Sequence, residues 1–467
     1  MNASTEGRDA TLTFEGDSPR ERTPAPAPHL FVIWAGGHPF GARHSLADVD
    51  AVEIGRSRDG GHERSAGGSR ERLRLRFDDP WMSSAHAQIV RRDLHFVVTD
   101  QGSKNGVFVG DRRVRETVLR DRDVLRCGNT FMRFRDRLVV DHDAPADLSE
   151  AQLPAETGLR TLLPALRRQF EEVVAIARSQ SPVLIRGPTG SGKELLAEAI
   201  HARSGRSGPL IPINCGALAP NLVESELFGH RKGAFSGAEE NREGLVQASA
   251  GGTLFLDEVG ELPLPAQAAL LRALQDGEVR PIGSAKPKKI DLRVIAATNR
   301  DLEGLVAGDR FRRDLYGRLA GYVVRLPPLV RRTEDFGVIA GSISRARSDP
   351  STLPRFSPDV VRALLAHPWP QNARELDHVL RRATTLAARD TITTEHLPPE
   401  LLNPGPLPSD LDAPVPEDAR RRQLIGLLEE HGGNISAVAR TMGKVRSQVQ
   451  RWLKRYGIEA SDYRSDR

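Results

Sequence analysis

The sequence contains only two cysteines, Cys127 and Cys215, among its 467 residues. A scaffold held by disulfide bonds is therefore excluded, and this usage is typical of a reducing cytoplasm. No apolar run approaches the length of a membrane span, and Leu30–Ala35 is far too short for one. Residues 1–22 are polar and include acids, so they resemble neither a signal nor a transit peptide. We therefore predict a cytoplasmic protein.

Length and composition indicate several globular domains. A chain of this length is too long for one hydrophobic core and is expected to form about three domains. The apolar fraction (39%) and the charged fraction (28%) are those of a globular protein, and the net charge of +5 does not by itself indicate nucleic-acid binding. Residue patterns predict a disordered tail over 1–28, a β-sandwich over 29–137, a linker over 138–156, an α/β P-loop domain over 157–400, a proline-rich linker over 401–416 and an all-α helix-turn-helix domain over 417–459.

A glycine-rich turn lies between a short apolar run and a helical stretch. Val183–Ile185 is predicted to be a buried strand, and Lys193 begins the helix. Strand, glycine turn and helix in this order are the context of a Walker A phosphate loop. The glycines let successive N–H groups turn inward around phosphate, while the helix N-terminus and the lysine add positive charge. The residues expected to bind ATP here are Gly187, Pro188, Thr189, Gly190, Ser191, Gly192, Lys193 and Glu194.

Two carboxylates follow the apolar run 251–256 further along the same domain. Glu194 stands where Ser or Thr usually binds Mg²⁺, so the glycine turn alone leaves a chance match open. An isolated acidic pair is usually an ordinary strand end, but after a glycine-lysine loop it indicates a Walker B site. Asp257 is then placed to hold Mg²⁺, and Glu258 to polarise the attacking water. Asn299, at the end of the next buried strand, is expected beside the γ-phosphate.

The N-terminal part shows the period-two alternation of half-buried strands. Leu73, Leu75 and Phe77 alternate with arginines, and similar short runs before and after them predict a β-sandwich. Three motifs lie between these runs: Gly55-Arg-Ser, Ser83-Ser-Ala-His and Asp100-Gln-Gly-Ser-Lys-Asn-Gly. Their order and spacing resemble the forkhead-associated (FHA) domain, which binds phosphothreonine peptides on the loops at one end of its sandwich.

This resemblance implies a phosphopeptide site at Arg56, Ser83, Ser84, Lys104 and Asn105. Arg56 can form a charge-assisted pair with phosphate, and the other side chains can add hydrogen bonds to phosphate and to the peptide backbone. Ser84 stands where the family often has arginine, which removes one cation near the peptide. Two alternatives stay open: a sandwich that keeps its turn residues for backbone reasons and binds no phosphate, and an FHA domain that serves only for oligomerisation.

One segment of the P-loop domain makes a second resemblance specific. It consists of Gly233, Ala234, Phe235, Ser236, Gly237 and Ala238. With the motif order over 157–400, it resembles the AAA+ domain of bacterial enhancer-binding proteins, the activators of sigma-54 RNA polymerase. In that family Gly-Ala-Phe-Thr-Gly-Ala forms a surface loop that contacts the sigma factor and moves with ATP hydrolysis, and general AAA+ ATPases lack it. Ser236 replaces the usual Thr and loses a methyl group, which favours a weaker sigma contact.

The same resemblance implies further roles in the P-loop domain. Asn214 corresponds to the residue that restrains the Walker B glutamate. Arg312 and Arg318 match arginine fingers that reach into a neighbouring subunit's site. Arg374 matches the sensor arginine of a helical lid, which the resemblance places from about residue 329. Because such fingers complete each site from the next subunit, the resemblance implies a homo-oligomeric ring, with a hexamer as the expected size. Fingers of this kind raise the rate by roughly 10³–10⁵.

The C-terminal part has the pattern of two short helices around a glycine turn. No Asp or Glu occurs between His431 and Ile458, whereas basic residues recur, which suits contacts with DNA phosphates and the major groove. The segment resembles the Fis-type DNA-binding domain that ends this activator family, and a three-helix bundle without DNA is the alternative. The residues expected on its open face are Lys444, Arg446, Ser447, Gln448, Gln450, Arg451 and Lys454.

These features together predict a transcriptional activator that uses ATP and Mg²⁺. Its expected partners are the sigma-54 RNA polymerase holoenzyme, upstream promoter DNA and a phosphothreonine protein or peptide. ATP hydrolysis would remodel the closed promoter complex. The alternative is a DNA-bound ATPase that acts as a repressor or scaffold without sigma-54 contact, and Ser236 keeps this alternative open.

Overall fold

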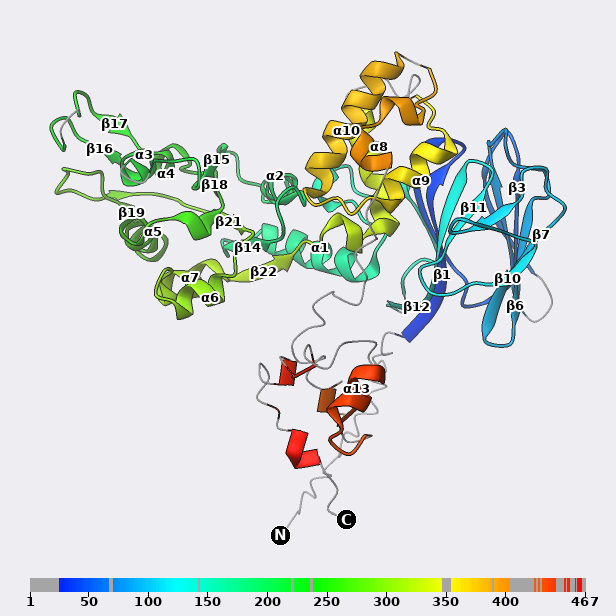
Figure 1. Cartoon of the computed structure of the whole chain (residues 1–467). Helices are drawn as coiled ribbons and strands as arrows, with labels where there is room; N and C mark the ends of the chain where they lie inside the picture. Colours follow the sequence, from blue (N-terminus) through cyan, green and yellow to red (C-terminus); the bar gives the residue numbers. More distant parts are fainter. Residues whose placement is uncertain are drawn as a thin grey trace, which may run out of the picture. The chain divides into compact units, whose positions relative to one another are not determined.

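The computed structural model in Figure 1 divides the chain into two units, residues 1–404 and 405–467. The first unit is described over 25–66, 70–141, 143–219, 222–235, 238–346, 354–388 and 390–402. The second is described over 424–425, 427–428, 431–441, 449–450, 452–453, 458 and 460–463. Residues 1–24 of the predicted tail, most of the proline-rich linker, Ser236 and Gly237 lie outside these residues, whereas residues 25–28, also predicted to belong to the tail, form the start of a strand. Among the described helices, none is long and apolar enough to cross a membrane.

The N-terminal part of the first unit is the predicted β-sandwich. One sheet has the order β13-β2-β1-β12-β11-β8-β9, and the other has the order β10-β7-β6-β3-β5-β4. Alternate residues such as Leu73 and Leu75 point between the sheets into one buried cluster. The strands are β1 (Ala25–Ala35), β2 (His38–Ser45), β3 (Val49–Arg56), β4 (Gly61–Ala66), β5 (Glu71–Phe77), β6 (Ala87–Arg92), β7 (His95–Asp100), β8 (Val107–Val109), β9 (Arg112–Val114), β10 (Glu116–Val118), β11 (Val124–Cys127), β12 (Thr130–Val140) and β13 (Asp147–Ser149).

One of these strands lies in a stretch rich in Gly, Ser and Arg, and another lies in a segment that the sequence predicted to be a linker. Strand β4 forms within the Gly/Ser/Arg-rich stretch after Arg56, and β13 forms within the predicted linker 138–156. Arg64 of β4 links these strands to their neighbours. Its Nε donates to Asp147 Oδ2 of β13 at 2.6 Å, and its Nη1 donates to Glu71 of β5 at 3.0 Å. His44 also contacts Asp147, at 2.7 Å. Main-chain pairing attaches β4 to β5 and β13 to β2. The ion pairs, which leave no hydrophobic period in the sequence, add contacts between these strands.

The central part is an α/β domain around a five-stranded parallel sheet of order β15-β18-β21-β14-β22. Both faces of this sheet are buried. In β14, Leu184 joins the cluster on one face, while Val183 and Ile185 join the cluster on the other. The strands are β14 (Val183–Arg186), β15 (Leu210–Asn214), β18 (Thr253–Asp257), β21 (Val294–Thr298) and β22 (Tyr322–Arg325). The helices are α1 (Pro164–Ala177), α2 (Lys193–Arg203), α3 (Val223–Phe228), α4 (Leu245–Ala248), α5 (Leu264–Asp276), α6 (Leu302–Ala307) and α7 (Arg313–Leu319).

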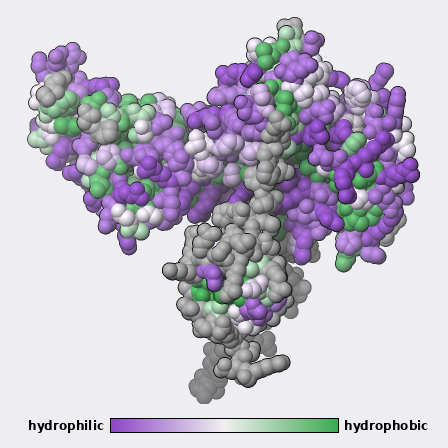
Figure 2. Space-filling model, viewed as in Figure 1, coloured by the Kyte–Doolittle hydropathy of each residue, from purple (hydrophilic) through white to green (hydrophobic). Residues whose placement is uncertain are grey.

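Helices α8 to α11 form a lid that follows the sheet in the chain (Figure 1). Their bounds are α8 (Phe336–Arg345), α9 (Pro358–Ala366), α10 (Asn372–Ala387) and α11 (Pro399–Leu402). Two β-ribbons, β16 (Gly229–His230) with β17 (Arg242–Glu243) and β19 (Glu278–Val279) with β20 (Lys288–Lys289), extend from the α/β domain. Most of the face seen in Figure 2 is hydrophilic, with smaller hydrophobic areas between.

The C-terminal unit has a small buried cluster of its own. Helix α13 (Ile435–Thr441) contributes Val438 and Ala439, and Val449 and Leu453 contribute from the segment predicted as the second helix. The predicted multidomain fold class is confirmed: a β-sandwich, an α/β P-loop domain with a helical lid, and an all-α C-terminal domain.

Candidate functional site

The predicted phosphate loop lies at the carboxyl end of β14, beneath the lid. It borders a cavity of about 590 Å³. Gly190 and Gly192 adopt φ values of +73° and +97°, which L side chains rarely adopt. A Cβ atom at Gly190 would also lie 2.1 Å from the main-chain oxygen of Gln371 in the lid. Glycine in this loop therefore allows both the tight turn of the main chain and the close approach of the lid.

Lys193 is the first residue of α2 and is almost fully buried. Its Nζ atom lies 3.2 Å from Gly187 O, 3.4 Å from Pro188 O and 3.5 Å from Glu258 Oε1. The other carboxylate oxygen of Glu258 accepts the main-chain N–H of Asn299 at 3.2 Å. The structure thus brings the predicted lysine, glutamate and asparagine together at one end of the cavity.

Three carboxylates near this point suit a magnesium ion in their chemistry. Asp257, Glu258 and Glu194 all line the cavity, and carboxylate oxygens are ligands that Mg²⁺ prefers. Burial raises the pKa of Asp257, as expected for a carboxylate placed where a cation would offset the loss of water. The Ser191 hydroxyl oxygen is buried and has no hydrogen-bond partner among the described residues. This donor set fits the ion.

Asn214 occupies a different arrangement from the predicted restraint on Glu258. It pairs with Asp257 in the register of β15 and β18. Its Oδ1 atom accepts the N–H groups of Gly216 and Ala217 at 2.9 and 3.2 Å. The side chain lines the cavity, but its observed bonds cap its own turn, so its role toward Glu258 stays a prediction.

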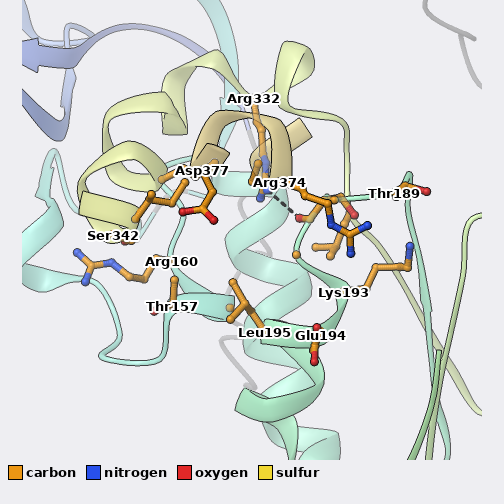
Figure 3. A pocket seen from close by; sticks show the side chains of 18 of the residues that line it. Thr157, Arg160, Thr189, Lys193, Glu194, Leu195, Arg332, Ser342, Arg374 and Asp377 are labelled. Carbon is orange, nitrogen blue, oxygen red and sulfur yellow. Dashed lines mark hydrogen bonds between the residues drawn. The ribbon is translucent and has the colours of Figure 1, made fainter. Parts of the chain in front are cut away.

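The lid contributes Arg374 and two residues that sequence reasoning missed. Arg374, on α10, lines the cavity (Figure 3). Asn372 donates from Nδ2 to Thr189 O at 2.9 Å and accepts Leu329 N–H at 2.7 Å. Arg332 donates from Nη2 to Ser191 O at 2.9 Å. The position of Asn372 directly after Pro370 and Gln371, at the start of a helix, was a sequence signal for its role. Arg332 gave no such signal, because a single buried arginine has no periodic pattern.

The predicted arginine fingers do not line the cavity of their own subunit. Arg312 and Arg318 are exposed at the ends of α7, and neither is among the cavity residues. Arg312 is held by Asp314 through Nε and Nη2 at 3.1 and 2.7 Å. Their action on a neighbouring subunit's nucleotide therefore stays a prediction.

The predicted sigma-factor loop follows β16, at the far end of the α/β domain from the lid (Figure 1). Gly233 N–H donates to Ala238 O at 2.8 Å and closes the loop. The Phe235 ring is 39% exposed and packs edge-on against His230, with ring centroids 5.0 Å apart. Ala234 lies against Gly283 of the neighbouring ribbon segment, where a Cβ atom would approach within 2.9 Å.

The predicted phosphopeptide residues gather on two loops at one end of the FHA sandwich and the strand end beside them. Ser83 O accepts Arg56 N–H at 3.0 Å, and Ser83 Oγ accepts Lys104 N–H at 3.2 Å. Asn105 donates from Nδ2 to Trp81 O at 2.7 Å. Arg56, Ser84 and Lys104 are exposed. The exposed indole of Trp81 (59%) beside them was not singled out from the sequence.

Of the residues predicted to contact DNA, the structure describes Gln450, which is exposed. The other six lie outside the described residues: Lys444, Arg446, Ser447, Gln448, Arg451 and Lys454.

Comparison with known proteins agrees with this geometry. Family models match for a sigma-54 interaction domain over residues 160–325, an AAA+ ATPase lid domain over 331–412, an FHA domain over 52–128 and a homeodomain-like domain over 416–461. The transcriptional regulatory protein ZraR of Escherichia coli O157:H7 is 39% identical over 320 residues, which cover 67% of this chain and 73% of ZraR. GlrR of E. coli K12 is 41% identical over 332 residues, covering 69% and 74%. The chain belongs to the family of sigma-54-dependent transcriptional regulators.

Among solved structures, NtrX from Brucella abortus in complex with ATP is similar, with 32% identity, a TM-score of 0.47 and coverage of 64% of this chain and 69% of NtrX. As a sigma-54-dependent regulator with an AAA+ domain, this protein is an ATPase that binds nucleotide. The FHA and homeodomain-like matches confirm the predicted identity of the first and last domains.

Proposed function

We propose that this regulator activates transcription by sigma-54 RNA polymerase, using ATP hydrolysis in a ring to remodel the closed promoter complex. The observation that carries the proposal is that the nucleotide cavity and the predicted sigma-factor loop lie at opposite ends of the α/β domain. Lys193, Asp257 and Glu258 line the cavity, while the loop after β16, which carries Phe235, lies at the far end of the domain (Figure 1). ATP hydrolysis in the cavity can therefore move the loop that carries Phe235 only if a conformational change passes through the domain between them.

Within the proposed reaction, Glu258 orients the attacking water and Lys193 binds the β- and γ-phosphates. Asp257 would hold a magnesium ion, which would neutralise charge on the phosphates. Arg374 contacts nucleotide from the lid. Arg318 of the next subunit completes the site, because no residue of α7 reaches the cavity of its own subunit. These assignments require a homo-oligomeric ring, for which we propose a hexamer.

We further propose that the FHA domain binds a phosphothreonine peptide and that the C-terminal domain binds upstream DNA. Arg56 is exposed and has no ion pair among the described residues, and it lies beside Ser83 and Lys104, whose groups can donate to phosphate. A charge-assisted pair with phosphate would satisfy this arginine.

In vitro transcription from a sigma-54 promoter tests the activator function. The full chain is expected to start transcription with ATP and to fail with a non-hydrolysable analogue. A chain with the Gly233–Ala238 loop shortened is expected to fail with either nucleotide. Equal transcription with the analogue would refute the proposal, because no hydrolysis would then be needed.

A second candidate is a DNA-bound ATPase that acts as a repressor or scaffold. The observation that favours it is the position of Phe235, which packs on His230 rather than projecting freely, together with Ser236 in place of Thr. A pull-down of purified sigma-54 with a transition-state nucleotide analogue separates the candidates. Sigma-54 retained with the analogue supports the activator, and sigma-54 absent with every nucleotide supports the repressor or scaffold.

A further inference from the structure

The outward face of the seven-stranded FHA sheet is covered by the AAA+ lid. The FHA residues on this docking face are Phe31, Ile33, Trp34, Phe131 and Leu148, and each is at most 3% exposed. They share one buried cluster with lid residues. The Trp34 ring meets the Phe356 ring edge-on, at 5.0 Å between centroids. Separation of the two domains would expose this apolar surface to water, so the FHA domain is fixed on the lid rather than only tethered to it.

Close backbone approach makes this docking specific. Gly337, in α8, lies so near the FHA sheet that a Cβ atom would be 2.0 Å from Phe40 O and 2.3 Å from Ile33 O. Gly341, about one turn further along the same helix, would place a Cβ atom beside only the guanidinium group of Arg345, at 2.9 Å. The two glycines therefore form a natural pair: a side chain at Gly337 would meet main-chain oxygens of the FHA sheet, whereas one at Gly341 would meet the end of a flexible arginine side chain, which can shift.

A hydrogen-bonded path joins the candidate phosphopeptide loop to this interface. Asp79, which is fully buried, begins the loop that carries Ser83. Its Oδ1 atom accepts Trp81 N–H at 2.9 Å, and its Oδ2 atom accepts Asn129 N–H at 2.7 Å. Asn129 in turn donates from Nδ2 to Phe356 O in the lid at 2.7 Å. The two bonds of Asn129 on this path are buried, so each is costly to break without a replacement.

The lid end of the path leads toward nucleotide. Phe356 N–H donates to Gly37 O of the FHA domain at 2.8 Å. Its side chain shares the cluster that includes Trp369 and Leu376, at the start of α10. The first turn of α10 supplies Asn372, which bonds the phosphate loop. Movement of Phe356 would therefore alter the packing under the start of α10, whose residues contact the nucleotide site.

An ionic contact joins the same two domains nearer the phosphate loop. Glu334 is 2% exposed and pairs with Arg135 and, at 3.7 Å, with Arg133, both on β12 of the FHA sheet. Two residues earlier in the chain, Arg332 donates to Ser191 O of the phosphate loop. The segment 332–334 thus contacts the FHA domain and the nucleotide site at once.

We propose that the FHA domain is a docked regulatory module that holds the lid closed on the phosphate loop, and that the path through Asp79, Asn129 and Phe356 passes the state of the phosphopeptide loop to the lid. Peptide binding acts on this path because Asn105, which a bound peptide would engage, now bonds Trp81 O at the start of the loop. The input half of this inference rests on the proposed phosphothreonine recognition, and the docking half does not.

The test compares three variants of the full chain. Asn129→Ala removes the side-chain bond to Phe356, Gly337→Ala opposes docking, and Gly341→Ala is the control in the same helix. Affinity for a fluorescent ADP is measured for each variant. Hydrogen exchange is measured at the amide of Phe356 and at that of Ile392, which donates to the main-chain oxygen of the adjacent Arg355 at 2.7 Å. The first two variants are expected to weaken ADP binding by about fivefold or more, which is the lower range of allosteric coupling, and to speed exchange. Gly341→Ala is expected to match the wild type within about twofold.

The effect of peptide binding on the lid is tested with a degenerate phosphothreonine peptide mixture, and the unphosphorylated mixture is the control. In the wild type the phosphorylated mixture is expected to weaken ADP binding by about fivefold or more. In Asn129→Ala the mixture is expected to bind equally well and to change ADP affinity by less than about twofold.

Three outcomes would overturn the inference. Unchanged ADP affinity and exchange in Asn129→Ala refute the docking half, even if Gly337→Ala fails to fold. A full peptide effect in Asn129→Ala refutes the path. A wild-type chain that binds no phosphorylated peptide refutes the input half together with phosphothreonine recognition, while the ADP affinities without peptide still decide the docking half.

Discussion

Arg332 of the lid donates a hydrogen bond to the main-chain oxygen of Ser191 in the phosphate loop, across 2.9 Å (Figure 3). Arg332 is 7% exposed, and its burial lowers its pKa while the charge of Asp335 opposes that effect. A buried cation is costly unless it is paired and hydrogen-bonded. The bond to Ser191 therefore links lid position to the shape of the loop that holds phosphate.

Replacing this arginine should weaken nucleotide binding. Arg332→Met keeps the length of the side chain and removes the bond to Ser191. Because a hydrogen bond from a charged group contributes about 1.5–3 kcal/mol, ADP affinity is expected to fall roughly tenfold or more. Arg331→Met, at the exposed neighbouring position, should leave affinity unchanged. Fluorescent-nucleotide titration measures both, and equal affinities would show that the bond does not shape the loop.

Glu258→Gln should separate binding from hydrolysis. The amide keeps the shape of the side chain but cannot accept a proton, so turnover is expected to fall by about 10²–10⁴, the usual contribution of a general base. ATP affinity and ring assembly should persist, because Lys193 and the loop glycines are untouched. Phosphate release and analytical ultracentrifugation provide the measurements. Normal turnover would remove Glu258 from its proposed role.

Arg318→Ala should abolish turnover without weakening nucleotide binding, because Arg318 lies outside its own cavity. Loss of a finger contributed in trans is expected to reduce the rate by about 10³–10⁵. Mixed rings provide the decisive measurement. Subunits carrying Arg318→Ala and subunits carrying Lys193→Ala should each be inactive alone and regain part of the activity when mixed. A mixture as inactive as its components would contradict the trans arrangement.

Phe235→Ala should uncouple hydrolysis from sigma-54. The ring contacts His230 and does not line the nucleotide cavity, so basal ATPase activity is expected to stay within about twofold of wild type. Affinity for sigma-54 with a transition-state analogue is expected to fall by roughly 30-fold, as for a central aromatic interface residue worth about 2 kcal/mol. Leu264→Ala, which trims an exposed hydrophobic side chain elsewhere on the domain, is the control in the same binding assay.

Asp335 should make stability depend on pH in an unusual direction. Burial raises its pKa to about 6 in the folded chain, despite hydrogen bonds from Thr161 and Leu162 that favour the charged form. Between about 4, its ordinary pKa, and about 6, the folded chain binds more protons at this group than the unfolded chain does. Its contribution to the free energy of unfolding is therefore greatest below pH 4, falls as pH rises, and is lost above pH 6.

Asp335→Asn tests this sign, because the amide does not titrate. The stability of the variant relative to wild type should increase from pH 4 to pH 7 by on the order of 3 kcal/mol, which corresponds to a shift of about two pKa units. Urea unfolding followed by tryptophan fluorescence is a suitable measurement, since Trp34 and Trp369 belong to the cluster beside this residue. A difference independent of pH would contradict the raised pKa.

Most of the features that could be predicted from the sequence came from local motifs. The phosphate loop lies where the strand, glycine turn and helix order indicated, and Leu73, Leu75 and Phe77 point into the sandwich as their alternation indicated. Such patterns depend on residues close in the chain. They are visible without knowledge of the fold.

The contacts between domains were not predicted, because they join residues far apart in the sequence. One signal was present. Leu30 to Trp34 form a continuous apolar run rather than an alternating one, which indicates a strand buried on both faces. In the structure Leu30 and Val32 face the sandwich core, while Phe31, Ile33 and Trp34 face the lid. The bonds of Arg332 and Asn129 gave no comparable signal, since a single polar residue has no period.

The two-sided burial of β1 limits how this protein can be divided or recombined. A sensor module joined only by a flexible tether could be cut away or exchanged for another without harm to the motor. Here, removal of residues 25–149 would strip the aromatic side chains of Phe336 and Phe356 of their cover, and the bare ATPase would be prone to aggregate. Any replacement sensor would need to supply a matching apolar sheet.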